Sequence, residues 1–142
     1  MTAQLIDGTA IAQKVRNEVK EKVAERIAAG KSQPGLATVL VGERVDSAAY
    51  VSMKQKACAE LGMTSFHHPV SVDISQDELE KLIEQLNADP KVNGILVQLP
   101  LPNHLDEERI LQLISIEKDV DGFSPINLGR LAQKGREPLY VP

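Results

Sequence analysis

The chain has 142 residues, enough for one domain with a buried core, and its aromatic content of 3% is very low. A formal net charge of −4 without a basic run argues against nucleic acid and anionic membrane as partners, and no apolar stretch is long enough to span a membrane. One cysteine excludes an internal disulfide, and the first six residues lack a signal-peptide pattern. We therefore expect a cytoplasmic protein that binds neither nucleic acid nor membrane.

The first part of the chain predicts a helix, a strand and a second helix. Apolar residues recur every four positions before Gly30, which predicts an amphipathic helix. These residues are Ile11, Val15, Val19, Val23 and Ile27. The apolar run 36–41 predicts a buried strand. Asp46 or Ser47 is then expected to cap a helix that ends at Gly62.

The remaining segments continue the alternation of strands and helices. Residues 65–70 are expected to form a strand, and the capping-box spacing at 75–78 begins a helix with an apolar stripe. The run 94–99 predicts another buried strand, followed by a helix over 106–114. An Asp-Val-Asp-Gly turn then precedes a short helix over 127–134.

This alternation predicts the fold class and the domain organisation. Strands that alternate with helices imply βαβ units, so we predict a three-layer α/β/α fold with a mainly parallel sheet. Residues 1–134 are interpreted as a single domain. The following residues read as an extended segment without a further element, so we expect 135–142 to be a truncated connector toward another domain of a longer protein.

Four side chains are candidates for chemistry because each lies near the end of a predicted element. Tyr50 and Lys54 are four residues apart and share one face of a helix. Gln98 lies at the end of the apolar run, and Asp121 precedes Gly122 in the predicted turn. Because open α/β sheets bind ligands at the carboxyl ends of their strands, we predict that these side chains converge on one cleft.

Each of these four residues also has an ordinary structural explanation. Lys54 is either a solvated lysine or a partly buried amine whose pKa is lowered, so that it exchanges protons near neutral pH. Tyr50 is either a boundary residue or a stacking surface for a flat ligand. Gln98 bonds either to loop backbone or to a ligand. Asp121 either forms the turn or grips the donor edge of a heterocycle.

Other reactive residue types give weaker signals. Cys58 lies among small apolar residues and is interpreted as a core thiol. The three histidines have no partners at metal-ligand spacing, so no metal site is expected. The chain carries no Gly-x-Gly-x-x-Gly and no P-loop, so no nucleotide cofactor is expected to bind within it.

The motifs together resemble one family, the bifunctional methylenetetrahydrofolate dehydrogenase/methenyltetrahydrofolate cyclohydrolases. In chain order they are Ile6-Asp7-Gly8, Val41-Gly42 with Ser47, Tyr50-Val51-x-x-Lys54-x-Lys56-Ala57, Gly94-Ile-Leu-Val-Gln-Leu-Pro-Leu-Pro102 and Lys118-Asp-Val-Asp-Gly-Phe-x-Pro-x-Asn-x-Gly-Arg-Leu131. The resemblance covers essentially all 142 residues at the family's spacing. It favours the functional interpretation of the four candidate residues.

The resemblance implies a reaction in one-carbon metabolism that serves purine and amino-acid biosynthesis. NADP oxidises 5,10-methylenetetrahydrofolate to 5,10-methenyltetrahydrofolate, which water then converts to 10-formyltetrahydrofolate. The resemblance implies that Lys54 is the key group of the hydrolytic step and that Gln98 tunes it. It also implies that Tyr50 packs against the folate and that Asp121 binds the pterin end. The implied folate site comprises Tyr50, Val51, Ser52, Met53, Lys54, Val97, Gln98, Leu99, Pro100 and Asp121.

The chain also departs from this family. The family's second half, a Rossmann-type NADP domain, has no counterpart here, so NADP is expected to bind outside this chain. A homodimer is expected for the complete enzyme. The loop 42–47 reads Gly-Glu-Arg-Val-Asp-Ser rather than the common Asp-Pro-Ala-Ser type, which we expect to alter the helix cap and not the chemistry. The alternative is a non-catalytic folate-binding or assembly module.

Overall fold

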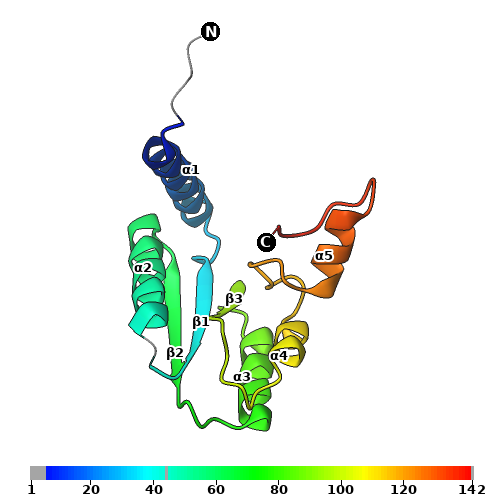
Figure 1. Ribbon diagram of the computed structural model, residues 1–142. Coiled ribbons are helices and arrows are strands. Elements are labelled where there is room, and N and C mark those ends of the chain that lie inside the picture. The colour runs from blue at the N-terminus through cyan, green and yellow to red at the C-terminus, as the bar shows by residue number, and fades with distance from the viewer. Residues whose placement is uncertain (1–5, 44, 142) are drawn as a thin grey trace.

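A short parallel sheet lies at the centre of the structure, which is a computed structural model describing residues 6–43 and 45–141. Helices and strands alternate along most of the chain (Figure 1). The elements are α1 Gly8–Ala28, β1 Gly35–Val41, α2 Val45–Leu61, β2 Thr64–Val70, α3 Gln76–Ala88, β3 Gly94–Val97, α4 Glu107–Leu113 and α5 Pro125–Ala132.

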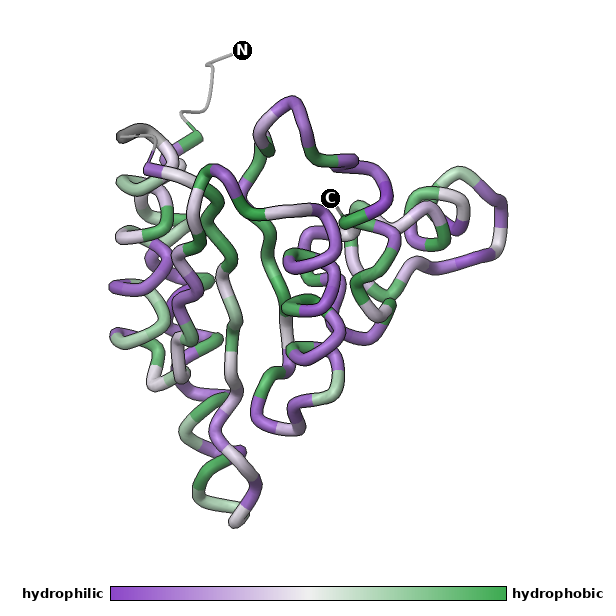
Figure 2. Tube along the Cα trace, turned by 90° about the horizontal axis from the view of Figure 1, so that it is seen from below, coloured by the Kyte–Doolittle hydropathy of each residue, from purple (hydrophilic) through white to green (hydrophobic). Residues whose placement is uncertain are grey.

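The three strands have the order β2-β1-β3, and both pairings are parallel. Helix α2 packs against β1 and β2 on one face, whereas α3 and α4 cover the other face (Figures 1 and 2). This arrangement confirms the predicted α/β fold with a parallel sheet and helices on both sides. No helix within the described residues is long and apolar enough to cross a membrane.

The main core lies between the sheet and helices α3 and α4. Alternate residues of β1 point into it, because successive side chains of a strand face opposite sides of the sheet. Its buried members include Ala37, Val39, Val41, Leu79, Ile83, Leu86, Ile95, Val97 and Ile110. Thr38 and Leu40 have the opposite parity and therefore face α2, and both are buried.

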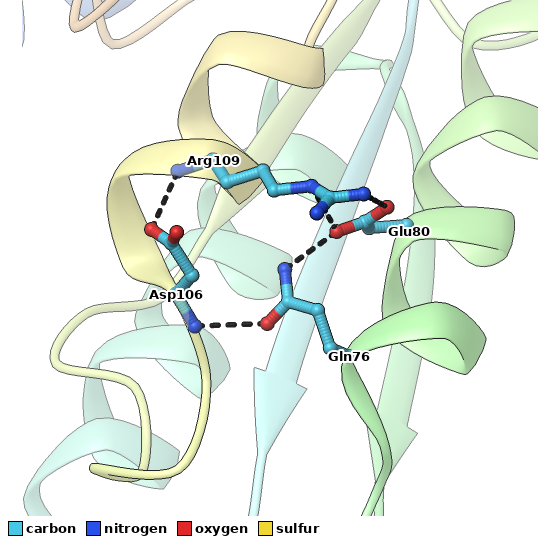
Figure 3. A network of polar contacts seen from close by, with 4 residues as sticks. All are labelled: Gln76, Glu80, Asp106 and Arg109. Carbon is cyan, nitrogen blue, oxygen red and sulfur yellow. Dashed lines mark hydrogen bonds and ion pairs between the residues drawn. The ribbon is translucent and has the colours of Figure 1, made fainter.

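Helix α3 is positioned by its cap and by a polar network to α4. Ser75 and Glu78 form the predicted capping box at its N-terminus. One turn further on, the guanidinium of Arg109 binds both carboxylate oxygens of Glu80, at 2.7 and 2.8 Å (Figure 3). The side-chain amide of Gln76 donates to Glu80 at 2.7 Å and accepts from the backbone N–H of Asp106 at 2.8 Å. This network joins the first turns of α3 and α4.

Several element boundaries differ from the prediction. Helix α2 already includes Val45, so the predicted cap at Asp46 or Ser47 is wrong, and both residues lie in its first turn. Strand β3 ends at Val97, two residues earlier than predicted. Helix α5 begins at Pro125, because proline suits the first helical position and Ser124 caps the helix.

Helix α1 forms as predicted but buries little of its apolar stripe. Among the described residues of this helix, Val23 is the one that is buried. Ile11, Val15 and Ile27 are about half exposed. The helix contacts α2 and projects beyond the end of the sheet (Figure 1). Most of its apolar face therefore lies outside the core.

We predict a coupling of about 0.5–1 kcal/mol between Glu80 and Arg109 in the free energy of unfolding, because the pair is bidentate and Glu80 is largely shielded. A double-mutant cycle of Glu80→Ala and Arg109→Ala in urea unfolding measures it. The matched control is the exposed pair Lys14 and Glu18 at 3.9 Å, for which we expect almost no coupling. Equal couplings for both pairs would contradict this prediction.

Candidate functional site

Helix α2 and the end of β3 bring Lys54 and Gln98 together. Val51 and Cys58 are buried on α2, and Lys54 lies three residues after the first and four before the second, so it shares their face toward the sheet. Gln98 has the same strand parity as Leu96, which also faces α2. The amine of Lys54 donates a hydrogen bond to Oε1 of Gln98 at 3.2 Å.

The amide of Gln98 is oriented from both ends. Its Nε2 donates to the carbonyl of Leu99 at 3.0 Å, which leaves Oε1 directed at Lys54. Its backbone N–H donates to the carbonyl of Val39 at 2.9 Å, one step beyond the last residue of β3. The sheet therefore fixes the backbone of Gln98, and its own loop fixes the side chain.

Asp121 approaches the same place from the turn before α5. Residues around Asp119 run alongside β3, where Asp119 forms an isolated parallel bridge with Ile95. This close approach requires a glycine at Gly94, because a Cβ there would lie 2.5 Å from a methyl group of Val120. The turn then reverses at Gly122, whose φ of 69° is the left-handed conformation that glycine adopts readily.

Lys54, Gln98 and Asp121 line a cavity of about 250 Å³, together with Leu96, Val97, Leu99 and Phe123. Burial raises the pKa of the Asp121 carboxyl above its usual value, the nearby charge of Lys54 lowers it, and the charge of Asp119 raises it further. The cavity thus combines a cation, an amide and a carboxylate on a partly apolar wall.

Five other predicted site residues do not line this cavity, and Tyr50 therefore does not converge on it with Lys54, Gln98 and Asp121 as predicted. Tyr50 is 58% exposed, one turn before Lys54, and is not among the residues that line the cavity. Val51 is 2% exposed, so its side chain is not available to a ligand at the surface. Ser52 is half-buried and Met53 is exposed. Pro100 lines a neighbouring hollow of about 320 Å³ instead.

A larger hollow, of about 610 Å³, lies at the carboxyl ends of β1 and β2. It is lined by Gly42, Glu43 and residues 69–72, so Glu43 is the charged side chain in its lining. Chemistry that moves protons needs groups that donate and accept them in close contact. We therefore place the candidate active site at the smaller cavity beside Lys54.

Two features of the site were missed by sequence reasoning. Phe123 is partly exposed and lines the cavity, and the scarcity of aromatic residues in the chain could have indicated it. Asp119 is buried and binds the turn that follows it. An aspartate three residues before a glycine is a common turn pattern, but nothing in that pattern distinguishes a buried carboxylate from an exposed one.

The arrangement suits proton transfer next to a bound heterocycle. A lysine amine held by an amide oxygen can donate or accept a proton at a fixed place. The carboxylate of Asp121 in the same cavity can accept hydrogen bonds from ring N–H or amino groups. Within residues 6–43 and 45–141, no group of three His, Cys, Asp or Glu side chains could hold a metal ion.

The chain is similar to known proteins over almost its whole length. The family model described as "Tetrahydrofolate dehydrogenase/cyclohydrolase, catalytic domain" matches residues 6–121. "Bifunctional protein FolD 2" of Arabidopsis thaliana is 52% identical over 141 residues, which are 99% of this chain and 47% of that protein. "Bifunctional protein FolD 4, chloroplastic" of the same plant is 53% identical over 140 residues, 99% of this chain and 39% of that protein.

A solved structure is also similar over the whole chain. The methylenetetrahydrofolate dehydrogenase-cyclohydrolase of Trypanosoma brucei, described as complexed with NADP cofactor and inhibitor, has a TM-score of 0.92 at 38% identity. The match covers 100% of this chain and 48% of that one. The present chain therefore spans about half the length, or less, of the relatives that it matches.

We predict that the Asp121 carboxyl titrates above 3.8, its ordinary value, and that Lys54→Met raises its pKa further by removing the charge that favours the carboxylate. NMR titration of isotope-labelled aspartate measures the Asp121 pKa in the wild-type chain and in Lys54→Met. Lys56→Met, an exposed position two residues on, is the control and should leave the titration unchanged.

The raised pKa has a consequence for stability with a definite sign. Asp121 contributes to the free energy of unfolding fully below its unfolded pKa, and this contribution is lost as the pH rises through its folded pKa. Asp121→Asn should therefore remove this pH dependence from the unfolding curve. A fall of the Asp121 pKa in Lys54→Met would contradict the effect assigned to the charge of Lys54.

Proposed function

Because the chain belongs to the tetrahydrofolate dehydrogenase/cyclohydrolase family, we propose that it is the folate-binding catalytic half of an enzyme of one-carbon metabolism. The reaction assigned to this cavity is the hydrolysis of 5,10-methenyltetrahydrofolate to 10-formyltetrahydrofolate. The observation that carries the proposal is the contact between the amine of Lys54 and Oε1 of Gln98, with Asp121 in the lining of the same cavity.

Lys54 would manage the protons of the hydrolysis. The methenyl group is a cation, and a cation beside an amine favours the neutral amine. Neutral Lys54 takes a proton from water as its oxygen attacks the methenyl carbon, which gives a neutral hydroxylated intermediate. The carbon–N5 bond then breaks as the hydroxyl loses its proton and N5 gains one. The products are 10-formyltetrahydrofolate and one released proton.

The other residues would bind and orient the substrate. Gln98 holds the Lys54 amine through its oxygen, so the proton acceptor stays beside the reacting carbon. Asp121 would accept hydrogen bonds from the pterin, which burial of both partners strengthens. Tyr50 is exposed one turn before Lys54, and its ring would pack against the folate.

We also propose the NADP-dependent oxidation of 5,10-methylenetetrahydrofolate, with NADP bound outside the described residues. A dinucleotide requires a glycine-rich turn between a strand and a helix. Among the described residues, the turn from β1 into α2 contains one glycine, Gly42, and the turns that lead into α3 and α4 contain none. The scarcity of glycine in these turns supports the proposal that NADP binds elsewhere.

The cellular setting is proposed from the same family. We expect a homodimer for the complete enzyme and a supply of one-carbon units for purine and amino-acid biosynthesis. The cytosol is the proposed location, although one relative carries the name of a chloroplast protein. The single cysteine, Cys58, is buried, and a chain with one cysteine needs no oxidising compartment for an internal disulfide.

Lys54→Met is expected to lower methenyltetrahydrofolate hydrolysis by about 10²-fold or more, because it keeps the apolar stem and removes the proton acceptor. The assay is the loss of methenyltetrahydrofolate absorbance, measured with this chain joined to the second half of a relative. Lys56→Met is the matched control and should retain activity. Dehydrogenase activity, assayed separately as NADPH formation, should be substantially retained in Lys54→Met. Unchanged hydrolysis in Lys54→Met would exclude Lys54 as the catalytic group.

The 142-residue chain alone is expected to show no saturable NADP binding and no NADPH formation. Calorimetric titration with NADP measures the binding, and absorbance measures NADPH. Hydride transfer needs the two carbons held about 3–3.5 Å apart, which requires both ligands in one cleft. Micromolar NADP binding by this chain would mean that a cofactor site lies among these residues after all.

A further inference from the structure

We infer that Asp119 and Asn127 are positioning residues of the proposed folate site. Together they fix the turn that carries Asp121 and Phe123, and they tie this turn to the segment around Leu139. The inference rests on the proposed function for the identity of the ligand. It assigns a role to two buried polar residues that do not line the cavity.

Asp119 organises the turn through its carboxylate. It is 2% exposed, and a buried charge is tolerated only when hydrogen bonds compensate for lost water. Its Oδ1 accepts from the N–H of Phe123 at 3.2 Å, and its Oδ2 accepts from the N–H of Ser124 at 2.8 Å and from Nδ2 of Asn127 at 2.8 Å. All three donors follow within eight residues, so the chain closes around Asp119 with Asp121 near the apex.

The chemistry of this contact requires a carboxylate. An ionised carboxylate accepts on both oxygens and donates nothing, which matches three converging N–H groups. An asparagine at this position would place N–H donors against the donors of Ser124 or Asn127. The negative charge of Asp119 also acts on Asp121, two residues away. Asp119 therefore influences both the place and the charge of the substrate-binding carboxylate.

The base of the turn is held to the rest of the fold. The N–H of Ile95 in β3 donates to the carbonyl of Lys118 at 2.8 Å. The amine of Lys118 donates to the carbonyls at the end of α3, those of Leu86, Asn87 and Asp89, at 3.0, 2.7 and 2.8 Å. The residue before Asp119 is thus fixed on both the strand and the helix. A substitution at Asp119 would therefore displace the apex of the turn, around Asp121, rather than its base at Lys118.

Asn127 links the turn to the residues that follow α5 through two hydrogen bonds of its side chain. It is 0% exposed, and while its amide nitrogen donates to Asp119, its Oδ1 accepts from the N–H of Leu139 at 2.9 Å. The hydroxyl of Tyr140 donates to the carbonyl of Glu117 at 3.0 Å, beside the base of the turn. One asparagine side chain therefore links the turn to the segment that follows α5.

The test uses the 142-residue chain with three single variants. Asp119→Asn replaces the acceptor, and Asn127→Ala removes the donor while leaving the charge of Asp119. Both should shift the amide resonances of Gly122 and Phe123 and move the Asp121 pKa toward its ordinary value, because an opened turn admits water. Both should raise the dissociation constant of 5-formyltetrahydrofolate, followed by NMR, by about tenfold, the effect of losing one charged hydrogen bond.

Tyr140→Phe is the control, since it removes only the bond to Glu117 and should change neither the Asp121 titration nor the dissociation constant. If the two residues had only a structural role, the variants would have lower melting temperatures. Their Asp121 pKa, measured at a temperature well below melting, would then be unchanged. Should Asp119→Asn not fold, Asn127→Ala decides the question alone.

The two proposals fail in different ways. The positioning role would be overturned if the wild-type chain binds 5-formyltetrahydrofolate and Asn127→Ala changes neither the affinity nor the Asp121 titration. Absence of wild-type binding, together with a moved Asp121 titration in both variants, would count against the folate assignment and leave the positioning role supported.

Discussion

The parallel pairing of β3 with β1 is the constraint on which the site depends. Strand β3 has four residues, all buried, and its register places Val97 beside Val39. Because strand side chains alternate, Gln98 must face the same side as Leu96, where α2 presents Lys54. A slip of one residue would turn Gln98 into the apolar core under α3 and remove the contact with the amine.

The two aspartates of the turn show how one short motif serves two purposes. Asp119 is buried with three donors, so its charge is compensated within the fold. Asp121 is only half-buried and faces the cavity and Lys54, and burial makes its ionised form less favourable. Such a group costs some stability in the free protein and can recover it when a ligand supplies hydrogen-bond donors. Val120 lies between the two aspartates, and Gly122, directly after Asp121, reverses the chain.

The sequence predicted the fold from periodicity alone, because the signals were local. The capping box at Ser75 and the continuous apolar run of β1 depend only on nearby residues, and both are confirmed. Boundaries were less predictable where tertiary contacts decide them, as at the end of β3. The contact of Lys54 with Gln98 joins residues 44 positions apart, and was predictable only as a shared edge of the sheet.

Other aspects of the site could not be predicted from pattern. The bond from Asn127 to Asp119 joins two polar residues whose sequence context resembles any exposed turn, so its burial is visible only in three dimensions. Tyr50 lies one helical turn before Lys54 on α2, yet it is 58% exposed and does not line the cavity, which the four-residue spacing does not reveal. The roles given to the folate-contacting residues come from the family resemblance and stay predictions.

The loose attachment of α1 has a consequence for how the chain loses its structure. This helix has 21 residues, yet Val23 is its buried residue among those described, and most helical stability in a protein comes from the packing of an apolar face. Its backbone amides can therefore exchange with solvent through a partial opening that leaves β1, β3 and α3 intact. We therefore expect α1 to open at a lower free energy than the strands that hold Gln98, whose side chains lie in the core.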